Sequence, residues 1–235
     1  MSIPALLLSM KTHLLDLLFP IECIGCGSEN QWLCDACVKK IELNNDFFCP
    51  FCGHFSFQGH TCFTCARNMK LGGAWVLGKY NSIMRACITA MKYSYIEQMG
   101  AILGLRMSSF FERFGHTNDF DIIMPVPLHS RRLLYRGFNQ SLALAQKISE
   151  HFSIPLDDET LIRKKFTKPQ VHYNRDKRLA NIKDAFRVED GDKILGKKIL
   201  LIDDVMTTGS TLEGCASALI GAGAKSVWGF VLAKR

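Results

Sequence analysis

The sequence predicts an α/β protein in which a parallel-sheet domain follows a small cysteine-rich segment. Eight of the ten cysteines lie between Cys23 and Cys65, a density typical of a metal-stabilised module. From residue 71 onward, short β-branched runs alternate with helical patterns, which indicates a parallel sheet covered on both faces. We therefore expect three parts, covering residues 1–20, 21–70 and 71–235.

The first part, residues 1–20, has the pattern of an amphipathic helix that ends before Pro20. Lys11, His13 and Asp16 interrupt any apolar run of membrane length, so we do not expect stable membrane insertion. Peripheral association with the inner membrane through this helix stays open. The segment lacks the basic start and cleavage site of a secretory signal, which favours a cytoplasmic location.

Four Cys-x-x-Cys pairs make up the second part. They are Cys23/Cys26, Cys34/Cys37, Cys49/Cys52 and Cys62/Cys65. Four thiolates at about 2.3 Å form the closed tetrahedral shell of a structural Zn²⁺, so the pattern predicts two zinc ions. Gly27 and Gly53 each follow the second cysteine of a pair, where a tight turn favours positive φ. Joining neighbouring pairs is the simplest arrangement, and a crossed arrangement stays open.

Other uses of these cysteines explain the pattern less well. Disulfides need an oxidising compartment, and a redox role accounts for one Cys-x-x-Cys but not for four in tandem. His54 and His60 are not required as ligands, because eight thiolates already fill two shells. Cys87 and Cys215 stand alone in apolar helical surroundings, so we expect both in the core.

The third part reads as alternating strands and helices. Strands are expected over residues 74–80, 121–126, 160–163, 185–188, 197–203 and 225–233, and helices over 82–93, 97–114, 139–152 and 210–220. The formal charge is −1 for residues 1–70 and +8 for residues 71–235. This excess favours a phosphate-rich ligand or a nucleic-acid strand, although an ordinary solvated basic surface also accounts for it.

The most informative stretch is LLIDDVMTTGST, residues 200–211. An apolar strand ends in Asp203 and Asp204, and a turn rich in hydroxyl groups then opens a helix whose N–H groups favour an anion. Gly209 allows the backbone to approach a ligand closely. The carboxylates repel phosphate but suit sugar hydroxyls or a Mg²⁺ reached through water. Alternatively, Ser210 and Glu213 form a capping box that only starts the helix.

A second motif follows the strand expected at 121–126. Pro125-Val126-Pro127-Leu128-His129 precedes Arg131, Arg132 and Arg136. Guanidinium groups bind phosphate oxygens in pairs, so a stiff turn followed by arginines is a plausible pyrophosphate cradle.

Residues 200–211 resemble the loop of type I phosphoribosyltransferases that binds 5-phosphoribosyl-1-pyrophosphate (PRPP): a hydrophobic strand, Asp-Asp, a variable pair and Thr-Gly-x-Thr. Together with the cysteine pairs, the proline–arginine motif, Arg163-x-x-x-Thr167-x-x-Gln170 and Arg178-x-x-Asn181, they resemble the ComF competence-protein family, including its GntX-like members. The resemblance covers residues 14–233.

The resemblance implies a double zinc ribbon joined to a phosphoribosyltransferase-like domain, with two structural zinc ions and Mg²⁺ bound with PRPP. Asp203, Asp204 and Arg178 would be catalytic, with Arg178 closing over the site. The implied PRPP-binding residues are Lys92, Arg131, Arg136, Asp203, Asp204, Val205, Met206, Thr207, Thr208, Gly209, Ser210 and Thr211.

The family's link to natural transformation implies two further partners, single-stranded DNA and the DNA-uptake machinery. Aromatic side chains between the cysteine pairs would stack on bases, although a small core around the metals is favoured for most of them: Trp32, Phe47, Phe48, Phe51, Phe55 and Phe57. Because no base-reading pocket is evident, three functions stay open. They are a PRPP-binding protein that handles DNA, a phosphoribosyltransferase acting on an unidentified base, and a PRPP-sensing regulator.

Overall fold

The computed structural model describes residues 20–93, 97–113, 119–164 and 184–235. The helix expected over residues 1–20 lies outside them, apart from Pro20. Within the described ranges, no helix has the length and apolar character needed to cross a bilayer.

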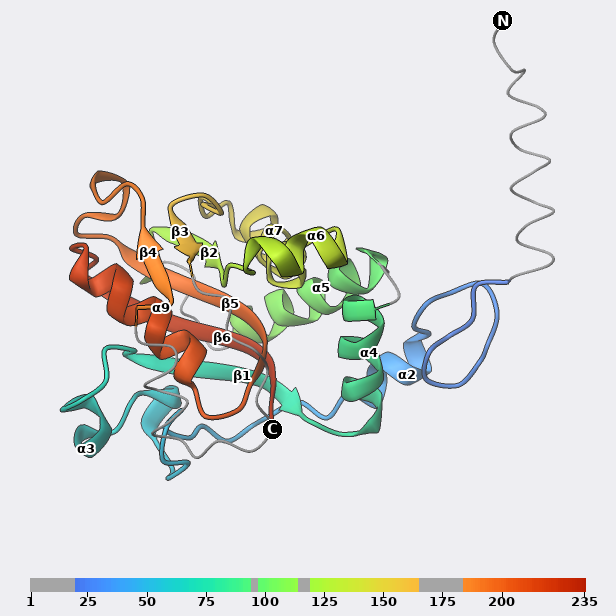
Figure 1. Ribbon diagram of the computed structural model, residues 1–235. Coiled ribbons are helices and arrows are strands. Elements are labelled where there is room, and N and C mark those ends of the chain that lie inside the picture. Colours follow the sequence, from blue (N-terminus) through green and yellow to red (C-terminus); the bar gives the residue numbers. More distant parts are fainter. Residues whose placement is uncertain (1–19, 94–96, 114–118, 165–183) are drawn as a thin grey trace, which may run out of the picture.

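A four-stranded parallel sheet in the order β1-β6-β5-β2 forms the centre of the molecule (Figure 1). Its strands are β1 (Gly73–Lys79), β2 (Ile122–Pro125), β5 (Lys198–Met206) and β6 (Ser226–Lys234). The register places Leu200 opposite both Ile123 and Trp228. Both faces of β5 are covered, which explains why its sequence is a continuous apolar run rather than an alternating one.

Helices cover the two faces of this sheet (Figure 1). On one face lie α4 (Ser82–Tyr93), α5 (Glu97–Arg113) and α7 (Gln140–Phe152), and on the other lies α9 (Ser210–Gly221). Successive β5 side chains alternate between the two cores. Leu200 and Ile202 pack with α4, α5 and α7, and Leu201 packs with α9. Cys87 and Cys215 are fully buried, one in each core, as predicted.

Four elements add to or differ from the expectation. β3 (Leu161–Arg163) and β4 (Phe186–Val188) pair antiparallel in a separate two-stranded sheet, in which Ile162 lies opposite Arg187. Residues 130–136, to which the sequence pattern assigns no element, form α6 (Ser130–Arg136), which His129 caps and Gly137, with φ 77°, ends. β5 continues beyond Asp203 to Met206, because β6 provides pairing partners along that length.

The cysteine-rich segment covers the β1 edge of the sheet from both sides. The first ribbon (residues 20–40, containing α2, Asp35–Lys39) packs into the core beneath α4, and the second ribbon (residues 47–70, containing α3, Phe63–Ala66) packs into the core beneath α9. Between the ribbons, Lys79 N–H donates to the Glu42 carbonyl at 3.0 Å and Asn44 N–H donates to Leu77 at 2.9 Å. An otherwise open strand edge is thereby paired.

Candidate functional site

The eight paired cysteines form two clusters of four. One contains Cys23, Cys26, Cys34 and Cys37, and the other contains Cys49, Cys52, Cys62 and Cys65. All sulfur atoms within a cluster lie within 4.8 Å of one another, whereas tetrahedral Zn–S bonds of about 2.3 Å require S···S separations of about 3.8 Å. The donor set therefore fits two structural zinc ions, and neighbouring pairs share a cluster rather than crossing.

The two ribbons repeat the same local geometry. In each, the N–H of the third cysteine donates to the sulfur of the first: Cys34 to Cys23 at 3.3 Å, and Cys62 to Cys49 at 3.4 Å. The turn glycines Gly27 and Gly53 have φ of 75° and 73°, as their positions predict. The repeated spacing of the cysteines therefore corresponds to one type of metal-binding turn that occurs twice in the fold.

Backbone N–H groups favour the thiolate at the first cysteine of each ribbon. Burial opposes ionisation of Cys23, but N–H groups led by that of Cys34 outweigh it and lower the pKa of Cys23 to about 6. Burial likewise opposes ionisation of Cys49, where N–H groups of Cys52 and Cys62 lower the pKa to about 6. Thiolates are the form that binds zinc.

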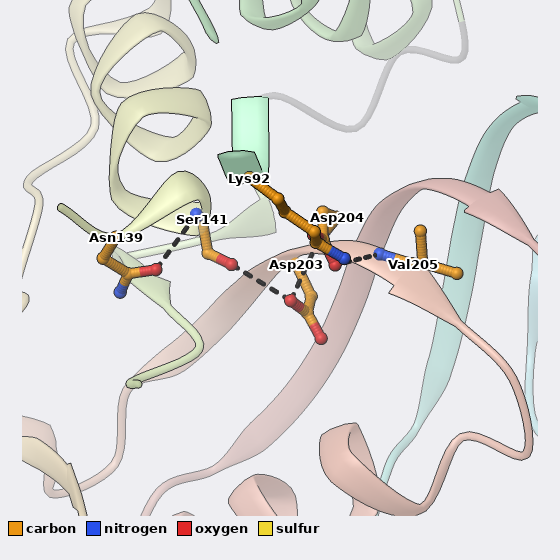
Figure 2. A network of polar contacts seen from close by, with 6 residues as sticks. All are labelled: Lys92, Asn139, Ser141, Asp203, Asp204 and Val205. Carbon is orange, nitrogen blue, oxygen red and sulfur yellow. Dashed lines mark hydrogen bonds and ion pairs between the residues drawn. The ribbon is translucent and has the colours of Figure 1, made fainter. Parts of the chain in front are cut away.

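Asp203 and Asp204 lie near the carboxyl end of β5, at the edge where open α/β sheets bind ligands. Asp203 Oδ1 accepts hydrogen bonds from Ser141 Oγ at 3.0 Å and from the Asp204 N–H at 2.9 Å, and Val205 N–H donates to Asp204 Oδ1 at 2.6 Å (Figure 2). Asp203 Oδ2 accepts no hydrogen bond within the described part of the chain. The pair is thus fixed on one side, with an oxygen left for a ligand.

Lys92 and Ser141 reach this carboxylate pair from two helices. Lys92, in the last turn of α4, places Nζ 2.5 Å from Asp204 Oδ2 (Figure 2). Ser141 lies in the first turn of α7, where Asn139 Oδ1 accepts from its N–H at 3.1 Å. Asn139 Nδ2 in turn donates to the Val126 carbonyl, which ties the start of α7 to the chain leaving β2. Sequence reasoning selected Lys92 but missed Ser141, whose only signal was its place after the arginine motif.

The carboxyl of Asp203 holds its proton unusually tightly. Burial and the adjacent negative charge of Asp204 raise the pKa of Asp203 to about 7, while Lys92 and the Ser141 hydroxyl act in the opposite direction. A cation or sugar hydroxyls bound at this position would stabilise the negative charge of the Asp203 carboxylate, which burial in the protein disfavours.

The threonine loop (residues 207–211) follows β5 and includes the first two residues of α9. Gly209, with φ 76°, is the N-cap of α9, and no side chain caps the helix within the described residues. The capping-box interpretation is therefore wrong. Glu213 instead turns away and accepts hydrogen bonds from the N–H groups of Lys70 and Leu71, at 2.8–3.0 Å. An uncapped helix start after a hydroxyl-rich turn favours an anion.

The basic residues predicted at the site lie in different places. Arg131 and Arg136 are on α6, with the Arg136 guanidinium 5.5 Å from the centre of the Tyr93 ring. Arg178 lies outside the described residues. Arg163 on β3 interacts electrostatically with Asp203, and burial lowers the pKa of its guanidinium. The sequence motif contained Arg163, but only the fold brings it to the carboxylates.

The aromatic residues of the ribbons divide into two groups. Phe48, Phe55 and Phe57 are exposed, and Phe63 is a fourth exposed phenylalanine of the second ribbon. Phe51 is buried at 7% exposure, and Trp32 and Phe47 pack partly buried against the core beneath α4. Burial against the two cores of the sheet thus accounts for only half of the six aromatic residues singled out from the sequence.

Known proteins give an independent view of the chain. Residues 14–66 match the double zinc ribbon domain and residues 139–235 the phosphoribosyl transferase domain. The DNA utilization protein YhgH of Salmonella typhi is 30% identical over 206 residues, which cover 84% of this chain and 88% of that protein. Competence protein F of Haemophilus influenzae shares 28% identity over 92% of this chain and 98% of its own length. The chain belongs to the ComF family.

More distant proteins are also similar to parts of the chain. The ComF relative from Bacillus subtilis, competence protein ComFC, is 27% identical over 86% of this chain and 84% of its own. Among solved structures, a purine phosphoribosyltransferase from Pyrococcus horikoshii aligns with 56% of this chain and 70% of its own, at 19% identity and a TM-score of 0.35.

Proposed function

We propose that this ComF-family chain acts in natural transformation, binding PRPP with Mg²⁺ and handling single-stranded DNA in the cytoplasm. The observation that carries the ligand assignment is the Asp203–Asp204 pair near the end of β5, which is followed by the turn that leads to the uncapped start of α9 at Ser210. The two competence proteins to which the chain is similar support the role in transformation.

The proposed site divides PRPP among three groups of residues. Asp203 and Asp204 take the ribose hydroxyls and Mg²⁺, which neutralises charge shared by the carboxylates and the pyrophosphate. The threonine loop and the first N–H groups of α9 take the 5-phosphate, assisted by the helix dipole. Lys92, already beside Asp204, and the arginines of α6 supply cations for the pyrophosphate.

A calorimetric titration of the zinc-loaded protein with PRPP and Mg²⁺ tests the ligand. We expect binding that is lost in Asp204→Asn and retained in Asp121→Asn. Asp121 makes a suitable control because its carboxylate accepts a hydrogen bond from the N–H of Lys198. Lys198 begins β5, so this contact lies at the end of β5 opposite to Asp204. Absence of binding in the parent protein would refute the assignment. Pyrophosphate release on adding a nucleobase would identify a phosphoribosyltransferase instead of a binding protein.

For DNA, we propose contacts at α6 and the end of α4. Tyr93 and Tyr135 are 61% and 77% exposed, and Arg131 and Arg136 lie on the same short helix as Tyr135. Aromatic rings that stack on bases, with arginines for the backbone, are the usual elements of single-strand binding. The DNA-uptake machinery is a further proposed partner.

Fluorescence anisotropy of a labelled oligothymidine at several salt concentrations tests the DNA assignment. Arg131→Ala and Arg136→Ala should weaken binding and reduce the salt slope by about one for each phosphate that the variant no longer binds. Lys225→Ala, which removes an exposed cation just before β6, should leave binding at the parental value. Equal effects of all three variants would contradict a site at α6. A rise in DNA affinity on adding PRPP would identify a regulator, because competition for the arginines of α6 could only lower that affinity.

A further inference from the structure

The second ribbon touches the threonine loop through one aromatic ring. Phe51 lies between Cys49 and Cys52, and its ring packs directly on Gly209. A methyl group added at Gly209 would lie 3.2 Å from Phe51 Cε1 and 3.7 Å from Met206 Sδ. The ring therefore fills the space that the glycine leaves, behind the backbone that begins α9.

Two polar connections hold the same ribbon to β6 and α9, the elements next to the loop. Lys234 Nζ, at the end of β6, donates to the Pro50 carbonyl at 3.0 Å. Glu213, in the first turn of α9, accepts from the N–H groups of Lys70 and Leu71 where the chain leaves the ribbon. Phe51 is thus fixed from the ribbon side while it contacts the loop.

A zinc ion at the second cluster would hold the turn that carries this ring. Cys49 and Cys52 flank Pro50 and Phe51 and belong to one set of four sulfurs, so a bound ion closes the turn that carries the ring. Cys49 and Phe51 also share the core that contains Met206 and Leu212. Without the ion, this short irregular turn has little regular structure of its own to hold it.

The first ribbon lacks this connection. Gly25 occupies the position in Cys23-Ile24-Gly25-Cys26 that Phe51 occupies in Cys49-Pro50-Phe51-Cys52. Gly25 packs against Ile83 of α4, in the core on the opposite face of the sheet. The two ribbons share a metal-binding geometry, but only the second places a side chain on the threonine loop.

We infer that Phe51 is a positioning residue for the threonine loop, and that zinc at the second cluster sets the affinity for a ribose-phosphate by fixing Phe51. This inference rests on the proposed PRPP site. Removing the ring would leave a gap behind Gly209 and let the loop backbone shift, so that its N–H groups no longer point to one anion position.

Hydrogen exchange and calorimetry on the zinc-loaded full-length protein test the inference. Phe51→Ala should retain two zinc ions per chain, exchange faster at residues 207–213 and bind Mg²⁺–PRPP about tenfold to about a hundredfold more weakly. Residues 198–202 of β5 serve as an internal reference whose exchange should not change. Phe51→Leu should recover part of the affinity. Phe55→Ala, at a 75% exposed position of the same ribbon, should behave as the parent.

Parental exchange at residues 207–213 in Phe51→Ala would overturn the inference. If Phe51→Ala loses zinc, the decision passes to Phe51→Leu, in which parental exchange would overturn it equally. The exchange measurement needs no PRPP. A parent protein that does not bind PRPP would therefore refute the proposed function, while the contact between Phe51 and the loop would still be tested.

Discussion

Lys92 Nζ lies 2.5 Å from Asp204 Oδ2, so a cation from the end of α4 already occupies one side of the carboxylate pair. The Lys92 and Asp204 side chains are 23% and 11% exposed. Their charges are therefore screened less than those of a surface pair, and each depends on the other for stabilisation.

Replacing Lys92 should destabilise the protein because it leaves two carboxylates without their cation. We expect Lys92→Met to lower the free energy of unfolding by about 2–3 kcal/mol, measured by urea denaturation without Mg²⁺. Lys79→Met, which breaks the solvent-exposed pair with Glu42, should cause a much smaller loss. Equal losses in the two variants would show that the Lys92–Asp204 ion pair contributes no more to the free energy of unfolding than an exposed pair does.

The titration of Asp203 predicts how stability depends on pH. Its pKa of about 7 exceeds the ordinary value of 3.8, so the folded protein holds this proton more tightly than the unfolded chain does. The contribution of this group is therefore complete below the ordinary pKa and is lost as pH rises through about 7. In Mg²⁺-free buffer, the decline should be weaker in Asp203→Asn. An identical pH profile for parent and variant would contradict the assignment.

Loss of one zinc ion should disturb one ribbon and one face of the sheet. Cys26→Ser and Cys52→Ser remove equivalent exposed ligands, and each variant should retain one ion per chain. Faster hydrogen exchange is expected within residues 20–40 for the first variant, and within residues 47–70 and the start of α9 for the second. A chelator that removes both zinc ions and leaves the thermal transition unchanged would exclude a structural role for zinc.

Glu213 should contribute to stability by joining the second ribbon to α9 rather than by capping. Glu213→Gln places an amide where the Lys70 and Leu71 N–H groups need an acceptor, at an expected cost of about 1–3 kcal/mol in guanidinium denaturation. Ser210→Ala should cost less, because Gly209 and not Ser210 is the N-cap. A larger loss of stability in Ser210→Ala than in Glu213→Gln would instead support the interpretation that Ser210 caps the helix.

Most of the secondary structure could be predicted from the sequence, because apolar periodicity and helix-ending glycines are local signals. The helix expected at residues 82–93 has those bounds, and β5 begins within one residue of its predicted start. β5 runs three residues further than predicted because its length depends on pairing with β6, which periodicity does not record. The antiparallel pairing of β3 and β4 was likewise not visible from either strand alone.

Short-range geometry is encoded directly in the amino-acid sequence. Two residues between cysteines allow both sulfurs to reach one ion, and Gly27 and Gly53 permit the backbone that this turn requires. The meeting of distant residues emerges only in the folded chain: Lys92 with Asp204, and Phe51 with Gly209. Such contacts depend on how two faces of a sheet are covered and on which core each ribbon joins. The spacing of residues along the chain does not determine which core each ribbon joins. That arrangement is fixed by the free energy of burying apolar surface, to which side chains from many helices and strands contribute.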